Sequence, residues 1–242
     1  DGAGLDTLRG EMRHTNKIGL WTNLMAMILS TRLYLKQQNA RVNDKVLFRA
    51  EPLAAFAWLT GSEYPARFLE IAWKKLLVNQ AHDAVGGCSV DRVHEEMQAR
   101  WGEVDTIADE LIRRSMRDIA GRIDGSKIDS SDLQLTVFNT LPHPRSGVAE
   151  FIVDLPIGAT AKSGGDSSRD RAGHPDASFS LETVDGKKVP VQILSDETYN
   201  ATIEGGYELP MPFAVRRFRV AARIPDAPAL GYEALVVRPG RK

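Results

Sequence analysis

Hydrophobic residues recur at helical spacing over the first half of the chain. From Pro65 to Asn79, apolar side chains lie three and four residues apart, which predicts an amphipathic helix. A second helix is predicted to begin at the candidate N-cap Ser89, with Asp91 in its first turn. The stretch Thr31 to Leu59 is rich in Leu, Lys, Gln and Ala and predicts a third helix, which Pro52 either restarts or kinks. Three helices of this length predict a bundle.

The second half of the chain has a different pattern, in which short alternating and β-branched segments predict strands. The predicted strands are 133–138, 148–155, 178–183, 189–195, 214–222 and 233–238. Turn-forming pairs separate them, among them Asp185-Gly186, Gly205-Gly206 and Pro225-Asp226. The polar stretch 161–178 predicts a mobile loop. We therefore expect an α+β fold in separate domains, with a three-helix bundle followed by a partial antiparallel β-sandwich.

Composition changes along the chain at the same place as the pattern. All four tryptophans precede residue 102, whereas ten of the twelve prolines follow residue 141. Proline removes a backbone donor, so long helices are not expected in the second half. A polar run between Gly121 and Leu133 predicts the boundary. It divides a helical domain at 19–125 from a β-rich domain at 133–242.

Charge and apolar runs limit the partners. Lys and Arg number 31 against 32 Asp and Glu, so there is no general positive field to hold a nucleic acid. The longest apolar run is far shorter than the roughly 20 residues that span a bilayer, and no basic and then apolar leader precedes it. We expect neither nucleic acid nor membrane as a partner. The single cysteine, Cys88, forms no disulfide within the chain, so a cytoplasmic location is expected.

Candidate chemistry lies between the second and third predicted helices. His82 and Asp83 are adjacent there, and Gly86 and Gly87 would permit unusual backbone conformations and the close approach of a ligand. A neutral imidazole is the commonest metal ligand, but zinc takes three or four protein ligands. Spacing alone leaves two interpretations open, a helix cap or hydrogen-bonded structural pair and a metal or catalytic role. His94 lies beside two glutamates, and we expect it on a solvated helix face.

A long motif at this junction resembles a known family. The motif is Asn79-Gln-Ala-His-Asp-Ala-Val-Gly-Gly-Cys-Ser-Val-Asp-Arg-Val-His94. It is similar to the Asn-Gln-x-His-Asp-x-x-x-Gly-(Cys/Thr)-Ser-x-Asp-x-Val-His stretch of the glycoside hydrolase family 38 α-mannosidases, above all the bacterial ones. Shorter similarities follow the family order over nearly the whole chain, at residues 10–13, 30–39, 51–54, 72–77 and 137–142. At Ala84-Val85 the family often has Ser-Ile.

The resemblance implies a position within a larger enzyme. Residues 1–18 would be the edge of the catalytic α/β domain, 19–125 the helical middle domain, and 133–242 the truncated opening of a β-rich C-terminal region. In the family, the histidine that matches His82 is a ligand of the active-site zinc, and the aspartate that matches Asp83 contacts sugar hydroxyls. The remaining zinc ligands and the aspartate nucleophile belong to an N-terminal domain that this sequence lacks, so the resemblance assigns no catalytic nucleophile here.

These implications predict a fragment of a zinc-dependent, retaining α-mannosidase that hydrolyses terminal α-mannosides. Its partners would be a mannoside or mannose-containing glycan and the N-terminal catalytic domain of the same chain, and the fragment alone would be inactive. The alternative is a non-catalytic interaction or carbohydrate-binding module, in which His82 and Asp83 only connect two helices.

Overall fold

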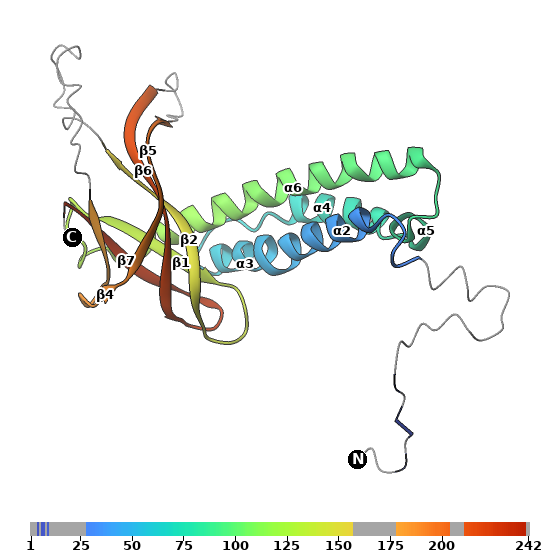
Figure 1. Ribbon diagram of the computed structural model, residues 1–242, viewed down its shortest axis with the longest axis horizontal. Coiled ribbons are helices and arrows are strands. Elements are labelled where there is room, and N and C mark those ends of the chain that lie inside the picture. Colours follow the sequence, from blue (N-terminus) through green and yellow to red (C-terminus); the bar gives the residue numbers. More distant parts are fainter. Residues whose placement is uncertain are drawn as a thin grey trace. The chain divides into compact units, whose positions relative to one another are not determined.

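The computed structural model describes residues 4, 6, 7, 9, 28–156, 178–203 and 211–240. The chain divides into two compact units, Asp1–Gly121 and Arg122–Lys242. Within the described residues the first unit is helical and the second consists of antiparallel sheets (Figure 1). The predicted α+β class with separate helical and β regions is confirmed.

Three long helical stretches make up most of the described first unit. They are α2 (Leu33–Lys45), which continues through the π-helical segment η1 (Val46–Ala50) into α3 (Glu51–Leu59), then α4 (Ala66–Asn79), and finally α6 (Asp91–Ala120). A fourth, short helix, α5 (His82–Gly86), lies between α4 and α6. The described unit is thus a bundle of three long helical stretches with one extra helical turn, which the sequence pattern did not predict.

Pro52 lies where the first long stretch changes its hydrogen bonding. It is the second residue of α3, and α3 follows directly after the π-helical segment η1. Proline has no N–H to donate and clashes with the preceding turn, and a single wider π-helical turn inside an α-helix lets the helix continue past such a residue. The sequence left open whether Pro52 restarts the helix or kinks it. In the structure the helix changes from α to π hydrogen bonding at η1 and then continues as α3.

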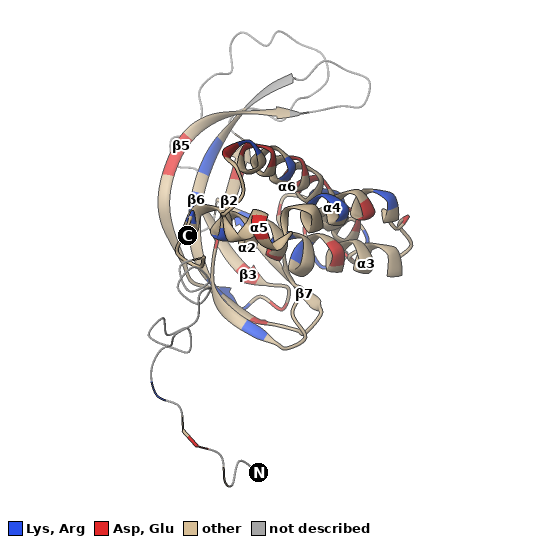
Figure 2. Ribbon diagram, turned by 90° about the vertical axis from the view of Figure 1, so that its right-hand side faces the viewer, with Lys and Arg blue, Asp and Glu red and all other residues tan. Residues whose placement is uncertain are grey.

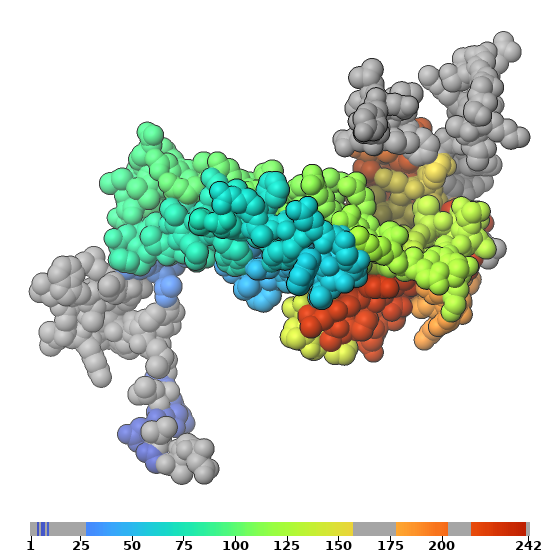
Figure 3. Space-filling model, turned by 180° about the vertical axis from the view of Figure 1, so that it is seen from behind, coloured from blue at the N-terminus to red at the C-terminus, as the bar shows by residue number. Residues whose placement is uncertain are grey.

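The buried stripe of α6 explains how the bundle packs. Its buried residues follow one another at spacings of three and four: His94, Met97, Trp101, Val104, Ala108, Leu111, Ser115 and Ile119. Five of them, from Met97 to Leu111, join buried side chains of α2, α3 and α4 in one hydrophobic cluster. In the space-filling view, the cyan atoms of α4 lie along the green atoms of α6 (Figure 3). The predicted N-cap Ser89 is wrong by one residue, because the N-cap is Val90, which makes no side-chain cap bond.

Ion pairs connect α2 to α6 along the surface of the bundle. The Arg41 Nη2 lies 2.9 Å from Asp105 Oδ2. The Lys45 Nζ lies 2.5 Å from Asp105 Oδ1 and 2.8 Å from Asp109 Oδ1. Charges of both signs follow the outer side of α6 (Figure 2). Because the pairs repeat in the same order along both helices, α2 and α6 run parallel. α4 runs antiparallel to α6, since Lys75 pairs with Glu103 and Asn79, further along α4, bonds to Met97.

Carboxylates paired within the helical unit predict acid sensitivity. Hydrogen bonds from the Arg113 and Arg114 guanidinium groups lower the pKa of Glu110 to about 2. The ammonium of Lys74 and the guanidinium of Arg67 likewise lower the pKa of Glu70. A depressed carboxyl pKa contributes stability that is present above the unfolded pKa, about 4.3 for Glu, and is lost as the pH falls toward the folded value.

We therefore expect the urea midpoint of the chain to fall as the pH is lowered from about 5 to about 2. Glu110→Gln should make this fall shallower, and salt at about 1 M should do the same by screening the exposed pairs. A midpoint that does not change over this range, with wild-type and variant chains superimposed, would contradict the expectation. Urea titrations at constant ionic strength, followed by circular dichroism, provide the measurement.

The described second unit holds two antiparallel sheets. In one sheet the strand order is β1 (Leu133–Asn139), β7 (Gly231–Pro239), β3 (Phe179–Thr183) and β4 (Lys188–Val189). In the other the order is β2 (Arg145–Pro156), β6 (Met211–Ala227) and β5 (Val191–Ile203). Buried residues of both sheets belong to one hydrophobic cluster, and the rings of Phe179 and Phe218 meet edge to face across it, 5.4 Å apart. Two sheets that share one core form a sandwich.

Two details of the predicted strands change. The pair Pro225-Asp226 was expected to be a turn, but both residues lie inside β6, near its end. Proline is tolerated there because Pro225 lies past the last pair between β6 and β5, at Ala222, and at the irregularity in the pairing of β6 with β2. The predicted strand 189–195 is divided between β4 and a much longer β5. The predicted loop 161–178 lies outside the described residues except at its last position.

None of the described helices is both long and apolar enough to cross a bilayer.

Candidate functional site

The short helix α5 carries the two candidate residues. His82 begins α5 and Asp83 follows it in the first turn. Both side chains are exposed, at 95% for His82 and 68% for Asp83, and the imidazole Nε2 lies 3.4 Å from the carboxylate Oδ1 of Asp83. The imidazole is therefore not enclosed by the bundle, and the pair presents an aromatic nitrogen and a carboxylate side by side at one end of the helical unit.

The first two residues of the motif have a structural role. Asn79 is fully buried at the end of α4, where its amide Nδ2 donates to the carbonyl of Met97 at 2.9 Å and its Oδ1 accepts from Arg100 at 3.3 Å. The Gln80 amide donates to the side-chain oxygen of Asn43 at 3.3 Å. These bonds attach the end of α4 to α6 and α2, so the following turn begins from a fixed point.

The two glycines of the motif differ in what they do. Gly87 has φ 83°, in the left-handed region, and ends α5, whereas Gly86 is buried with its α-carbon facing Ile28. A Cβ at Gly87 would lie 3.2 Å from Lys36 Nζ and 3.3 Å from the backbone oxygen of Thr31. The close approach that the sequence suggested for a ligand is thus made by Lys36 of α2 and by the two residues before α2, Thr31 and Arg32.

Gly87→Ala is expected to lower the free energy of unfolding by about 1–2 kcal/mol, because alanine is strained at positive φ and the neighbouring backbone oxygen cannot yield. Gly102→Ala is the matched control. Gly102 lies inside α6 with open space around its α-carbon, so alanine there should stabilise the chain by about 0.5–1 kcal/mol. Urea denaturation measures both. Equal effects of the two substitutions would contradict the assigned role of Gly87.

The thiol of Cys88 belongs to the same corner. Its Sγ donates to Asp83 Oδ1 at 3.4 Å and approaches the Asp83 backbone oxygen at 3.6 Å. That hydrogen bond, with burial and the negative charge of the carboxylate, raises the pKa of the exposed Cys88 thiol. The thiol is therefore neutral at pH 7 and acts as a hydrogen-bond donor to Asp83.

The donor set at this corner fits part of a zinc site. A neutral imidazole and a carboxylate are both zinc ligands. The parts of the chain that the structure describes contain no group of three or more His, Cys, Asp or Glu side chains that could hold a metal by themselves. His82 and Asp83 therefore fit zinc only with donors from polypeptide beyond the described residues. The residues 10–13 that match the family also lie outside them.

His94, the last residue of the motif, differs from the expectation. It was expected on a solvated face, but only 3% of it is exposed, because position 94 falls on the buried stripe three residues before Met97. Neither ring nitrogen has a hydrogen-bond partner within the described part of the chain. Burial lowers the pKa of His94, so the ring is held in its neutral form.

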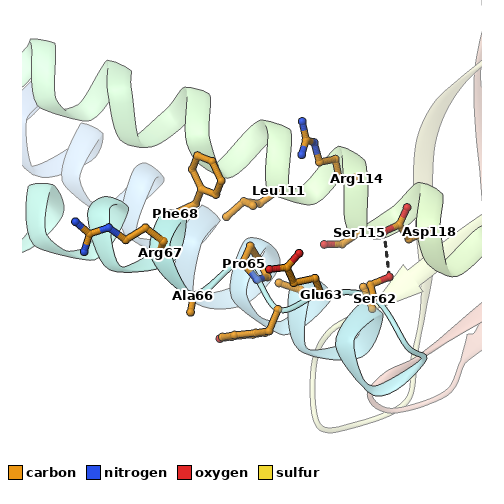
Figure 4. Close-up of a pocket in the computed structure, with 13 residues that line it drawn as sticks. Ser62, Glu63, Pro65, Ala66, Arg67, Phe68, Leu111, Arg114, Ser115 and Asp118 are labelled. Atoms are coloured by element: carbon orange, nitrogen blue, oxygen red, sulfur yellow. Dashed lines mark hydrogen bonds between the residues drawn. The ribbon is translucent and has the colours of Figure 1, made fainter. Parts of the chain in front are cut away.

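A pocket lies at the opposite end of α4 from the His82 corner. Its volume is about 540 Å³, and its wall is formed by the segment between α3 and α4 and by the last turns of α6 (Figure 4). Ser62 and Asp118 are joined by a 3.0 Å hydrogen bond at its edge, with Glu63 beside them and Phe68 toward the opposite side. Since α4 is about 20 Å long, this pocket is separate from the His82 corner. None of its lining residues is a histidine or cysteine.

Sequence comparison supports the family resemblance. Residues 23–119 match the family described as "Alpha mannosidase middle domain". Two curated relatives also match. One, from Halalkalibacterium halodurans, carries the provisional name mannosylglycerate hydrolase and is 32% identical over 136 residues, which are 56% of this chain and 15% of that protein. The other, Alpha-mannosidase 2C1 from Mus musculus, is 28% identical over 132 residues, which are 54% of this chain and 12% of that protein.

Solved structures show the same fold. A crystal structure of an alpha-mannosidase from Enterococcus faecalis V583 superposes with a TM-score of 0.74 at 22% identity, over 89% of this chain and 25% of that one. A glycosyl hydrolase family 38 protein from Enterococcus faecalis superposes with a TM-score of 0.71 at 26% identity, over 88% of this chain and 25% of that one. The chain thus spans about a quarter of these structures and less of the curated relatives.

Residues 23–119 thus match the alpha-mannosidase middle domain family, and the resemblance of the chain to the glycoside hydrolase family 38 α-mannosidases is confirmed.

Proposed function

We propose that this chain is part of a zinc-dependent, retaining α-mannosidase that hydrolyses terminal α-mannosides, and that His82 and Asp83 are its contribution to the active site. The observation that carries the proposal is the exposed, adjacent pair at the α5 corner, within a family motif and a middle domain of this family. The substrate class, a mannoside or a mannose-containing glycan, is supported by the names of the relatives.

His82 would donate one imidazole nitrogen to the zinc. Its ring is exposed and its Nε2 lies beside a carboxylate, which favours the orientation of a ligand imidazole. Zinc, when bound, would supply Lewis-acid binding of neighbouring sugar hydroxyls. The remaining ligands would come from the N-terminal catalytic domain, which the resemblance assigns to the preceding polypeptide.

Asp83 would orient the sugar. A carboxylate accepts hydrogen bonds, and a hydroxyl of the terminal sugar is a matching donor. Its backbone oxygen accepts from the amides of Gly87 and Cys88, both at 3.2 Å, so the residue is held at its main chain, while its carboxylate accepts from the Cys88 thiol and remains largely exposed. A carboxylate fixed in this way distinguishes sugar epimers by the direction of one hydroxyl.

A retaining glycosidase needs two carboxyl groups about 5–5.5 Å apart, one acting as nucleophile and the other as acid and then base. We assign neither role to a residue of this chain. The chain alone is therefore proposed to be inactive, and to require the N-terminal catalytic domain of the same polypeptide. With one exposed cysteine and no disulfide, a reducing, cytoplasmic location is also proposed.

The proposal is tested by zinc content and stereochemistry. The full-length protein should bind about one zinc per chain and release α-mannose first from an aryl α-mannoside, as followed by proton NMR. The purified 242-residue chain should release none. Full-length protein that hydrolyses the substrate without any divalent metal, or with inversion, would overturn the proposal.

The second candidate is a non-catalytic interaction or carbohydrate-binding module. An observation that favours it is the pocket beside Glu63 and Phe68, which has polar and aromatic side chains suited to a sugar and lies away from His82. Full-length protein with neither metal nor mannosidase activity, combined with mannoside binding that Phe68→Ala abolishes, would favour the module.

A further inference from the structure

The corner that carries His82 and Asp83 is held from one side by two cations near the start of α2. The Arg32 Nε donates to the backbone oxygen of Gly87 at 3.1 Å, and the Lys36 Nζ donates to the backbone oxygen of Gly86 at 2.8 Å. The last carbonyls of a helix have no partner within it. Arg32 and Lys36 satisfy two of them at the end of α5, through charge-assisted hydrogen bonds.

Arg32 also connects α6 to this corner. Its Nη2 donates to Asp91, the first residue of α6, at 2.7 Å. The Arg32 backbone has φ 48° and ψ 54°, a left-handed conformation that is uncommon for a residue with a side chain. One residue in a costly conformation thus contacts both Gly87 and Asp91, and strain of this kind persists where the surrounding contacts hold it in place.

Lys36 completes the contact and is itself partly buried. Its ammonium also donates to the backbone oxygen of Thr31, and burial lowers the Lys36 pKa. A Cβ at Gly87 would lie 3.2 Å from its Nζ, so glycine there allows the close approach. The Lys36 ammonium is therefore half-buried against main-chain oxygens. Replacing it with an apolar side chain would leave those oxygens without this hydrogen-bond donor.

The contact is transmitted to the candidate ligands through the main chain of α5. Gly86 ends the five-residue helix that His82 begins, and the Gly87 amide donates to the backbone oxygens of Asp83 and Ala84 at 3.2 Å and 3.1 Å. A displacement of the Gly86–Gly87 peptide would therefore act on Asp83 through this hydrogen bond, and on His82 through the peptide bond that joins it to Asp83.

We propose that Arg32 and Lys36 are positioning residues for the metal and sugar site, and that they hold the α5 corner so that His82 and Asp83 are presented in one orientation. The inference rests on the proposed function in taking His82 as a metal ligand. Neither residue touches the metal or the substrate in this assignment, because both act through the backbone of Gly86 and Gly87.

The test uses the full-length protein and three variants. Lys36→Met removes the ammonium and keeps the apolar stem, and Lys36→Arg restores a cation. Lys45→Met is the matched control on the same helix, because Lys45 pairs with Asp105 and Asp109, away from the corner. Amide hydrogen exchange of Val85, Gly87 and Cys88 reports the corner itself, and titration of the apoprotein with Co²⁺ reports the metal site by affinity and visible spectrum.

Lys36→Met is expected to raise exchange of these amides about tenfold or more and to weaken Co²⁺ binding about 10–100-fold, the usual range for residues that orient ligands. Lys36→Arg should recover most of both losses. Lys45→Met should leave exchange at the corner and Co²⁺ binding within about twofold of wild type, whatever it does to global stability.

Two outcomes would overturn the inference. Unchanged exchange in Lys36→Met would show that the corner does not depend on the cation. Faster exchange with unchanged Co²⁺ affinity would show that the contact is structural only. A parallel His82→Ala protein separates these failures from failure of the proposed function, because retained Co²⁺ affinity in that variant rejects the ligand assignment and not the contact between Lys36 and α5.

Discussion

His82→Ala in the full-length protein is expected to lose its zinc and to lower kcat/KM for an aryl α-mannoside by roughly a thousandfold or more, since a catalytic metal supplies several kcal/mol of stabilisation. The imidazole has no place in the core of the helical unit, because 95% of its side chain is exposed. Its loss should therefore leave folding intact. Metal analysis of the dialysed protein and steady-state kinetics measure the two effects.

Asp83→Asn is the matched comparison at the adjacent position. It keeps the size of the side chain and removes the charge, so we expect about one zinc per chain with turnover reduced by roughly 10–100-fold, the range of one charged hydrogen bond. The contrast between the two variants identifies a ligand and a substrate contact. Full zinc and full activity in His82→Ala, or loss of zinc in Asp83→Asn alone, would reverse the assigned roles.

Trp101→Ala is expected to have the largest effect on folding, lowering the free energy of unfolding by about 3–5 kcal/mol. Trp101 is fully buried in the middle of the α6 stripe and is the largest of the fully buried side chains in the described residues. Its indole Nε1 has no hydrogen-bond partner among those residues, so the cost comes from lost packing and the remaining cavity.

Trp58→Ala removes the same atoms from an exposed position and serves as the control. Trp58 is 56% exposed near the end of α3, where its ring contacts Tyr64 edge to face. We expect a cost of about 1 kcal/mol or less, since an aromatic pair contributes about 0.5–1.5 kcal/mol and little area is buried. Urea denaturation at pH 7 compares the two, and similar losses at both positions would contradict the packing argument.

The helices of the first unit could be predicted from spacing because each has one apolar stripe. Leu69, Ala72 and Leu76 repeat at three and four residues and lie buried on α4, as the sequence indicated. The same reasoning failed for His94, which the neighbouring glutamates suggested was solvated. Its position on the stripe, three residues before Met97, outweighed the polarity of adjacent residues.

Strand positions were also predictable, but their ends and pairing were not. Alternation identified the segments that became β1, β3 and β7, whereas the turn signal of Pro225-Asp226 was overridden inside β6. Alternation reports which side of a strand is buried and says nothing of its partner. The order β1-β7-β3-β4 depends on contacts between residues far apart in the chain.

The sequence by itself determined the class of each unit, the junction that carries His82 and Asp83, and the family to which the motif is similar, because all of these depend on local order and spacing. Only the tertiary structure decided which residues of the motif are structural and which are exposed for binding. Asn79 is buried as an anchor, His82 and Asp83 face outward, and Gly87 meets the cations of α2. The contact of Arg32 and Lys36 with the corner joins residues about 50 positions apart, and no local pattern encodes a contact of that separation.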